Sequence, residues 1–314
     1  MTRRVVAALA VVALLAACAA GPQTQRLQRE HAAVELAGVP FFPQEAYQCG
    51  PAALATVLAA AGVDVSPAAL VDEVYVPARR GSLQAEMLAA VRRRGHLPVL
   101  LDAQIDAALR ELHAGRPVLV LQNLGAGPLP VWHYAVLIGF DPQTQRFILR
   151  SGRERRLMLP ARRFLETWDR GGRWMLVVAD VDTPPASAGV DGWLRAAAPL
   201  ESLGQTALAE RAYEAAVQRW PDAALAWAAL GNARAAAGAL RPALDAYRRA
   251  LALEDPPLLR NNYAWTLAAA GCRDAAIAQL QTGLQQADGG ERAVLERTLQ
   301  EIESARPDGA QCPM

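Results

Sequence analysis

Apolar positions change their spacing along the chain and divide it into segments of different structure. Over 50–95 they recur every three to four residues, which predicts three helices: one behind Cys49, one capped at Ser66, and one ending at Gly95. Over 97–179, short runs rich in β-branched and aromatic residues predict strands. The expected strands are 97–101, 117–121, 131–141, 146–150, 155–159 and 173–179, and the expected helices between them are 103–113 and 162–168.

Helices followed by a mostly antiparallel sheet indicate an α+β domain over residues 38–180. Its strand 131–141 is almost entirely apolar, as expected of a central strand covered on both faces. Residues 181–189 contain two prolines among small side chains, which is typical of a linker. Helical spacing then returns, so 190–314 is expected to be an all-α domain.

The all-α segment has an internal period of 33 or 34 residues, shown by Gly204, Gly238 and Gly271. Three further columns keep the same register: Ala209, Ala243 and Ala276; Tyr213, Tyr247 and Leu280; and Ala216, Ala250 and Gly283. The pattern resembles the tetratricopeptide repeat, with repeats at about 190–223, 224–256 and 257–289 and a capping helix over 291–304. Such repeats imply a concave surface for a partner protein or peptide. An alanine-rich helical bundle without repeats is the alternative.

The N-terminal residues 1–17 have the pattern of an export signal. Arg3 and Arg4 precede an apolar run that is too short to span a bilayer. The run ends in Leu15-Ala16-Ala17-Cys18, which resembles the lipobox of bacterial lipoproteins and implies lipidation at Cys18. An ordinary signal peptide cleaved near Ala20 is the alternative. Residues 18–37 are expected to be a tether, and the absence of aspartate after Cys18 favours the outer membrane, facing the periplasm.

Composition narrows the classes of function. The chain has 314 residues, of which 53% are hydrophobic, and a formal net charge of +1, so it can bury two cores and offers no basic surface for nucleic acid. It contains no glycine-rich phosphate loop, no Cys-x-x-Cys pair, no His-Glu-x-x-His and no acidic calcium loop. We therefore expect neither a cofactor nor a metal.

Cys49 begins an apolar helix as part of Cys49-Gly50-Pro51. Proline suits the first helical turn, and the unpaired N–H groups and positive dipole end found there lower the pKa of a cysteine. This position favours a reactive thiolate. A buried structural cysteine that happens to start a helix is the alternative, so the assignment needs a base.

His133, at the start of the central strand, is the best candidate for that base. An imidazole at the rim of a sheet, where a helix N-terminus packs, can activate a cysteine. A satisfied core histidine is the alternative reading. The remaining histidines fit the role less well, because His31 lies in the tether, His96 in a turn and His113 near a helix end.

Two stretches together carry a resemblance to a known family: Gln44 through Leu54, with Cys49-Gly50-Pro51, and Trp132 through Asp141, with His133-Tyr134. They resemble the papain-like cysteine peptidases that process bacteriocins at double-glycine leaders, and their stand-alone relatives, over roughly 39–179. The resemblance implies a papain-like α+β fold and a protein or peptide substrate. It also implies Cys49 as nucleophile, His133 as general base, and Gln44 with the Cys49 N–H as donors to the oxyanion.

The chain departs from that family at two places. Gln44 lies five positions before the cysteine where relatives have six, and Gln48 is the less suitable alternative. Relatives carry Asp-Pro on the strand after the histidine strand, where this chain has Ser151 and Gly152. Ser151 is therefore the position expected to orient His133, with Asp141 in a turn and Asn123 on a neighbouring strand as more distant options.

Cys272 and Cys312 are expected to form a disulfide in an exported protein, which would tie the tail to the last repeat and leave Cys49 as the free thiol. The sequence thus predicts an exported, lipid-anchored cysteine peptidase whose helical repeats recruit a partner or substrate. The competing prediction is a papain-like lipoprotein with weak or lost catalysis, acting as a binding or scaffold module through its repeats.

Overall fold

The computed structural model describes residues 22–44, 48–125, 128–305 and 312. The chain forms two compact units: unit 1 extends to Asp180 and includes Pro185–Ala188, and unit 2 contains Val181–Pro184 and the chain from Gly189. The segment expected as a linker is thus divided between the units. On unit 1, the fully buried Glu111 carboxylate accepts hydrogen bonds from the Ser187 N–H and hydroxyl, both at 2.5 Å.

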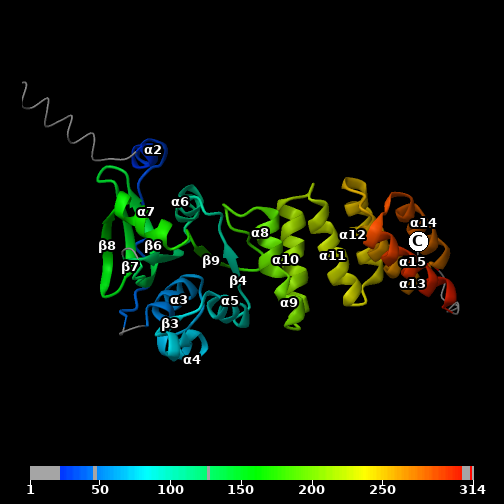
Figure 1. The fold of residues 1–314 in the computed structure, drawn as a ribbon, viewed down its shortest axis with the longest axis horizontal. Helices are drawn as coiled ribbons and strands as arrows, with labels where there is room; N and C mark the ends of the chain where they lie inside the picture. The colour runs from blue at the N-terminus through cyan, green and yellow to red at the C-terminus, as the bar shows by residue number, and fades with distance from the viewer. Residues whose placement is uncertain (1–21, 45–47, 126–127, 306–311, 313–314) are drawn as a thin grey trace, which may run out of the picture. The chain divides into compact units, whose positions relative to one another are not determined.

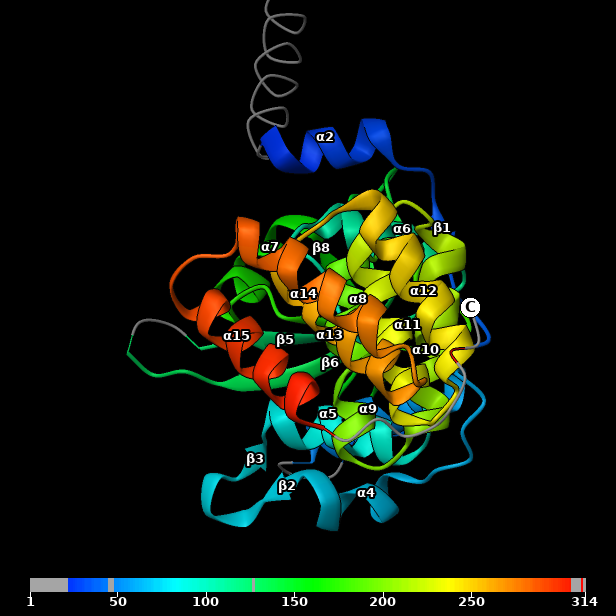
Figure 2. The same cartoon turned by 90° about the vertical axis from the view of Figure 1, so that its right-hand side faces the viewer.

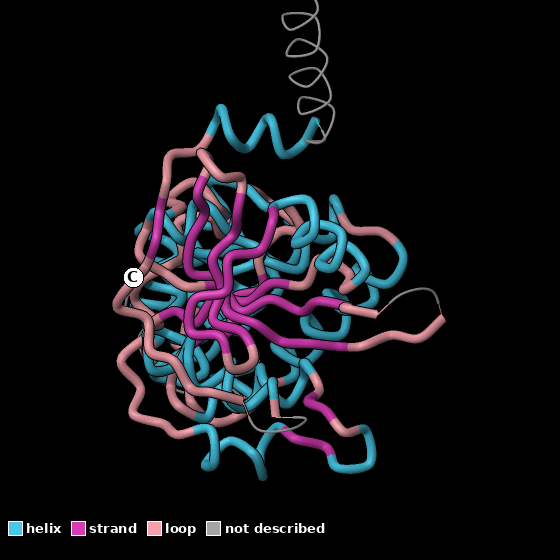
Figure 3. The backbone as a smooth tube through the Cα atoms, turned by 90° about the vertical axis from the view of Figure 1, so that its left-hand side faces the viewer, coloured by secondary structure: helices cyan, strands magenta, loops and turns pink. Residues whose placement is uncertain are grey.

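Unit 1 is built on one antiparallel sheet, in the strand order β4-β9-β5-β6-β7-β8. Its strands are the long magenta segments of Figure 3. The strands are β4 Leu97–Leu100, β5 Val118–Asn123, β6 Trp132–Asp141, β7 Arg146–Ser151, β8 Glu154–Pro160 and β9 Met175–Ala179. The central β6 is buried from Tyr134 to Phe140, because helices cover both faces of the sheet. The expected order, helices followed by an antiparallel sheet, is confirmed.

Helices lie on both faces of this sheet (Figure 1). They are α3 Cys49–Ala60, α4 Pro67–Val74, α5 Gln84–Arg93, α6 Ile105–His113 and α7 Ala161–Arg170. Helix α3 packs on β6, and its core is completed by Tyr134, Val136 and Ile138, which alternate along that strand. Because α3 is apolar on all sides, it is buried nearly throughout.

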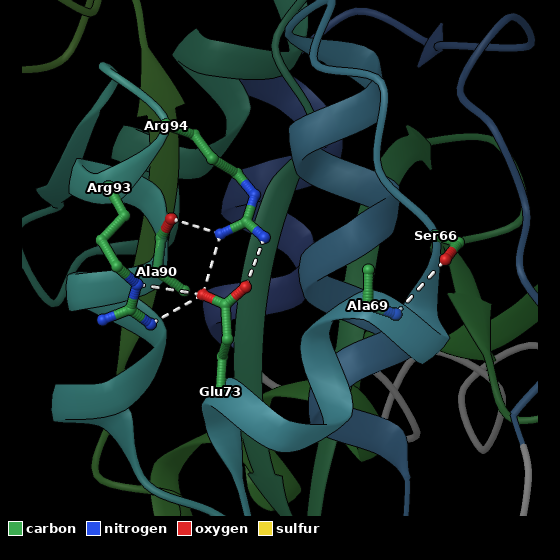
Figure 4. Close-up of polar contacts among 6 residues, drawn as sticks. All are labelled: Ser66, Ala69, Glu73, Ala90, Arg93 and Arg94. Atoms are coloured by element: carbon green, nitrogen blue, oxygen red, sulfur yellow. Dashed lines mark hydrogen bonds and ion pairs between the residues drawn. The ribbon is translucent and has the colours of Figure 1, made fainter.

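The helices α4 and α5 are tied together by ion pairs. Glu73 accepts from the guanidinium groups of Arg93 and Arg94 at 2.6–3.0 Å, and the Ser66 hydroxyl caps α4 by accepting from the Ala69 N–H (Figure 4). These arginines hold the pKa of Glu73 at about 2. Arg93 and Arg94 therefore have a structural role, which is to join α5 to α4.

Between α4 and α5 lies a small hairpin that the sequence analysis missed. Strands β2 Tyr75–Val76 and β3 Gly81–Ser82 pair around the 3-10 turn η1 Pro77–Arg79, apart from the main sheet (Figure 3). The third expected helix, which ends near Gly95, therefore begins only after this hairpin, at Gln84. Strands of two residues leave too short a pattern for periodicity to detect.

The tether expected over 18–37 is wrong for its described part. Residues Pro22–Glu30 form helix α2, and Val34–Glu35 form β1, which pairs with β6. Leu27 is fully buried on this helix, and Arg26 and His31 bind Asp106 of α6 at 2.7 and 2.8 Å. These two ionic contacts and the buried leucine help to hold the segment on unit 1. The predicted signal segment 1–17 and the lipidation site Cys18 lie outside the described residues.

Unit 2 is all-helical, as expected. Its helices are α8 Val190–Ala197, α9 Pro199–Ser202, α10 Thr206–Arg219, α11 Ala224–Ala236, α12 Leu240–Leu253, α13 Pro257–Ala269, α14 Arg273–Gln286 and α15 Gly289–Ser304, and the longer ones pack as sequential neighbours (Figure 2). No helix in the described part of the chain combines the length and apolar character needed to cross a membrane.

The recurring residues of unit 2 occupy equivalent places in its helices. Ala209, Ala243 and Ala276 are fully buried near the starts of α10, α12 and α14. Gly231 lets α11 approach Tyr247, since a Cβ at that glycine would lie 2.9 Å from the ring. The predicted disulfide between Cys272 and Cys312 is present.

Candidate functional site

Cys49 is the first residue of α3 and lines a cleft of about 870 Å³. His133, the second residue of β6, and Gln44, from the segment before α3, line the same cleft. The sequence-predicted nucleophile, base and oxyanion donor therefore meet in one hollow. Cys49 is also the one free cysteine among the residues that the structure describes.

The sulfur of Cys49 is subject to two opposing effects. Backbone N–H groups of Tyr134, Gly50 and Cys49 itself favour its thiolate, as expected at a helix start, but burial is the larger effect and raises the pKa of the thiol. The expectation of a lowered pKa is therefore wrong for the free protein, because α3 is covered more completely than a helix start facing water. One of the N–H groups beside the sulfur is that of Tyr134, which follows His133 directly in the chain. The Cys49 sulfur therefore lies beside the start of the histidine strand.

His133 is held by the residue expected to orient it. Its Nε2 lies 2.8 Å from the Ser151 hydroxyl oxygen on β7. Val136 is paired with Arg150, so His133 and Ser151 are diagonal neighbours on one face of the β6–β7 ladder. Burial lowers the pKa of the imidazole, and no carboxylate contributes to that shift. The ring is therefore positioned by a neutral partner and is itself neutral near pH 7.

Of the two glutamines before the nucleophile, only Gln44 faces the cleft. Its side-chain Nε2 donates weakly to the Tyr134 carbonyl at 3.5 Å, and its backbone N–H donates to the Gly152 carbonyl at 3.1 Å. Gln48 precedes α3 and lines a separate depression. A donor whose present partner lies at 3.5 Å can turn towards an oxyanion at little cost.

The other residues considered from the sequence are occupied elsewhere. His31 binds Asp106, His96 lies 2.9 Å from the Arg94 carbonyl, and His113 is exposed at the end of α6. Asp141 accepts from the backbone of its own turn, and Asn123 accepts from the Val131 N–H at 2.9 Å at the end of the β5–β6 hairpin. None of these five lines the cleft.

One further group of residues in the described part of the chain has donor atoms close enough to hold a metal: Glu30, His31 and Asp106. The Arg26 guanidinium already binds both carboxylates at 2.7 Å. A cation there would have to displace this guanidinium, so the group is a structural ion-pair cluster joining α2 to α6.

The cleft also contains residues that sequence reasoning missed, and several of them come from the β2–β3 hairpin and its turn. Ser82 lies against the start of α3, and its buried hydroxyl oxygen has no hydrogen-bond partner among the described residues. Its carbonyl accepts from the Tyr134 hydroxyl at 3.3 Å. Arg79 at the end of η1 and Arg80 directly after it also line the cleft. In the sequence, the only signal that could have indicated these cleft residues was the pair of arginines before Gly81.

The part of the chain that contains this site matches the model of a known protein family. Residues 36–173 match the model of the Peptidase_C39 like family, and this segment contains all four predicted site residues. The comparison with curated proteins finds no match. The expected architecture, a papain-like α+β domain followed by an all-helical region, is confirmed.

Three solved structures are similar to part of the chain. A putative C39-like peptidase from Bacillus anthracis is 19% identical, with a TM-score of 0.41 and coverage of 48% of this chain and 98% of that one. The peptidase domain of Streptococcus ComA, a bi-functional ABC transporter involved in a quorum sensing pathway, is 21% identical (TM-score 0.37, 45% and 98% covered). A double glycine motif protease from an AMS/PCAT transporter, in complex with the leader peptide, is 22% identical (TM-score 0.35, 48% and 99% covered).

Proposed function

We propose that the chain is a cysteine peptidase that cleaves peptide bonds with Cys49 as nucleophile and His133 as general base. The observation that carries this proposal is the single cleft in which Cys49, His133 and Gln44 meet, with His133 held by Ser151. The Peptidase_C39 like match over the same residues supports it.

The resting pair is a neutral thiol and a neutral imidazole, since burial raises the pKa of Cys49 and lowers the pKa of His133. When His133 carries its proton on Nε2, Ser151 accepts that proton in a hydrogen bond and Nδ1 is the basic nitrogen. As the Cys49 sulfur attacks the substrate carbonyl carbon, Nδ1 takes the thiol proton. Proton transfer thus accompanies attack instead of preceding it.

Attack converts the carbonyl oxygen into an oxyanion, which Gln44 Nε2 and the Cys49 N–H stabilise. The tetrahedral intermediate then expels the amine, which receives the proton from His133, and a thioester remains on Cys49. Water adds to the thioester carbonyl while His133 takes its proton, and collapse releases the acid and restores the thiol. Ser151 keeps the imidazole oriented throughout, with less stabilisation of the cation than a carboxylate would give.

A second function, peptide binding without efficient cleavage, is favoured by one observation. His133 is positioned by a hydroxyl, and the thiol has a raised pKa, so neither group is activated before substrate arrives. In this case the cleft would serve as a docking site and the helical unit would act as the scaffold.

Our proposal for the whole chain adds an anchor and a partner. The pattern at Leu15-Ala16-Ala17-Cys18 supports export and lipidation at Cys18, with the protein on the outer membrane facing the periplasm. Helices that begin at 190, 224 and 257 support tetratricopeptide repeats that recruit a protein partner or substrate.

Cleavage of a peptide library tests the proposed activity. The full-length protein in detergent is incubated with tryptic peptides of a bacterial lysate, and new termini are identified by mass spectrometry. We expect a consistent set of cleavages, none with Cys49→Ala, and rates reduced about 100-fold with His133→Ala. His96→Ala is the matched control, because the His96 imidazole lies 2.9 Å from the Arg94 carbonyl and outside the cleft. A folded protein that cleaves nothing would support the binding module instead.

A further inference from the structure

The β2–β3 hairpin forms one wall of the cleft and is fixed to the nucleophile's helix. The Tyr134 hydroxyl donates to the Ser82 carbonyl at 3.3 Å, and Gly50 packs directly against the Ser82 side chain. Tyr134 and Gly50 adjoin His133 and Cys49 in the sequence. The hairpin therefore has a defined position relative to the reacting groups, and so do the residues of its turn.

Arg79, at the end of that turn, is an exposed cation facing the cleft. Its side chain makes no hydrogen bond or ion pair within the described residues, whereas Arg93 and Arg94 on the adjacent helix are both held by Glu73 (Figure 4). Of the described residues that line the cleft, none is Asp or Glu. An incoming carboxylate would thus meet Arg79 without displacing a partner from the part of the chain that the structure describes.

The backbone beside Arg79 is also unusual. Arg80 has φ 46° and ψ 44°, the left-handed region that glycine adopts readily and arginine rarely does. Gly81 follows directly, yet the strained position holds an arginine whose side chain lines the cleft. Strain of this kind is retained where a particular side chain is needed.

Another part of the cleft lining is apolar and open to solvent. Val131 and Trp132, at the start of the histidine strand, are each 55% exposed, and both line the cleft (the β5–β6 hairpin is visible in Figure 2). An extended peptide in the cleft would therefore meet both apolar surface and positive charge.

We propose that the cleft selects peptides carrying an acidic side chain near the bond presented to Cys49, with Arg79 as the residue that binds the carboxylate. This specificity rests on the proposed peptide substrate. The charge-assisted contact forms at the surface of the cleft, so it contributes selectivity and salt dependence more than overall affinity.

Binding measured without catalysis separates this inference from the proposed activity. The protein with Cys49→Ala is titrated against fluorescein-labelled decapeptides that share one Ala/Leu/Gly sequence and carry two Glu, two Gln or two Lys. We expect the Glu peptide to bind most tightly, and Arg79→Glu to weaken its binding about tenfold and to favour the Lys peptide. Arg110→Glu, an equal charge change at an exposed residue of α6 outside the cleft, should leave the order unchanged.

The outcomes are distinct. Equal binding of the three peptides, no binding of the Glu peptide, or an equal effect of Arg79→Glu and Arg110→Glu would each overturn the acidic preference. Glu-selective binding by a protein that cleaves nothing with Cys49 intact would uphold the preference and overturn the peptidase.

Discussion

The close approach of Gly50 to Ser82 makes a prediction opposite to that of helix propensity. Alanine is favoured over glycine within a helix by about 1 kcal/mol, so Gly50→Ala in the first turn of α3 should stabilise the chain if propensity decided. In the structure, a Cβ at residue 50 would lie 2.2 Å from the Ser82 hydroxyl oxygen and 2.4 Å from its Cβ, against an ordinary contact of 3.4 Å or more.

The magnitude follows from which atoms must move. Rotating the Ser82 hydroxyl does not relieve the contact with its Cβ, so the β2–β3 hairpin or the start of α3 has to shift by about 1 Å. Overpacking of this kind costs about 1–3 kcal/mol, which outweighs the gain in propensity. Because Tyr134 donates to the Ser82 carbonyl, the displacement would also disturb the residue next to His133.

The assay uses the backbone amides of α3 as its probes. Hydrogen exchange of these amides, followed by mass spectrometry, reports the free energy of opening of unit 1. We expect Gly50→Ala to lower this free energy and Ser82→Gly to suppress the effect, since the next contact, Tyr134 Cδ2, lies at an ordinary 3.7 Å. Gly38→Ala is the control, because nothing lies within 4 Å of its Cβ. An increase in stability for Gly50→Ala alone would refute the reasoning.

Three further variants test other parts of the structure. Peptidase activity should rise with pH through the pKa of His133, and because burial lowers this pKa, half-maximal activity should fall below pH 6.5. The variant Ser151→Asp should stabilise the imidazolium, so a pH profile should show the midpoint at higher pH and a raised kcat. Arg150→Met removes a buried guanidinium that donates to three backbone carbonyls and should cost about 2–3 kcal/mol in urea unfolding, whereas a loss near zero would contradict its structural role. Cys312→Ala removes the disulfide to Cys272 and should lower the free energy of unfolding of unit 2 by about 3 kcal/mol, measured by calorimetry. Added reductant should cause the same loss in the native protein and no further loss in the variant.

Much of the site could be predicted because its signals are local. The segment Cys49-Gly50-Pro51 by itself predicts the start of a helix. The apolar run after His133 likewise predicts a central strand without information from other segments. The β2–β3 hairpin gives no such signal, since two strands of two residues carry no period and pair only because α4 and α5 bring their ends together. Arg79 and Ser82 were therefore missed as residues of the cleft.

Taken alone, the sequence determined the order of helices and strands, the division into an α+β and an all-α part, and the identity of the residues able to do the chemistry, because each depends on spacing along the chain. Only the tertiary structure decided that Pro22–Glu30 packs on unit 1, that Ser151 binds the His133 imidazole, and that burial raises the pKa of the Cys49 thiol. The physical reason is that burial and contact come from segments far apart in sequence. A helix start lowers the pKa of a cysteine only until the surrounding elements exclude enough water to raise it again.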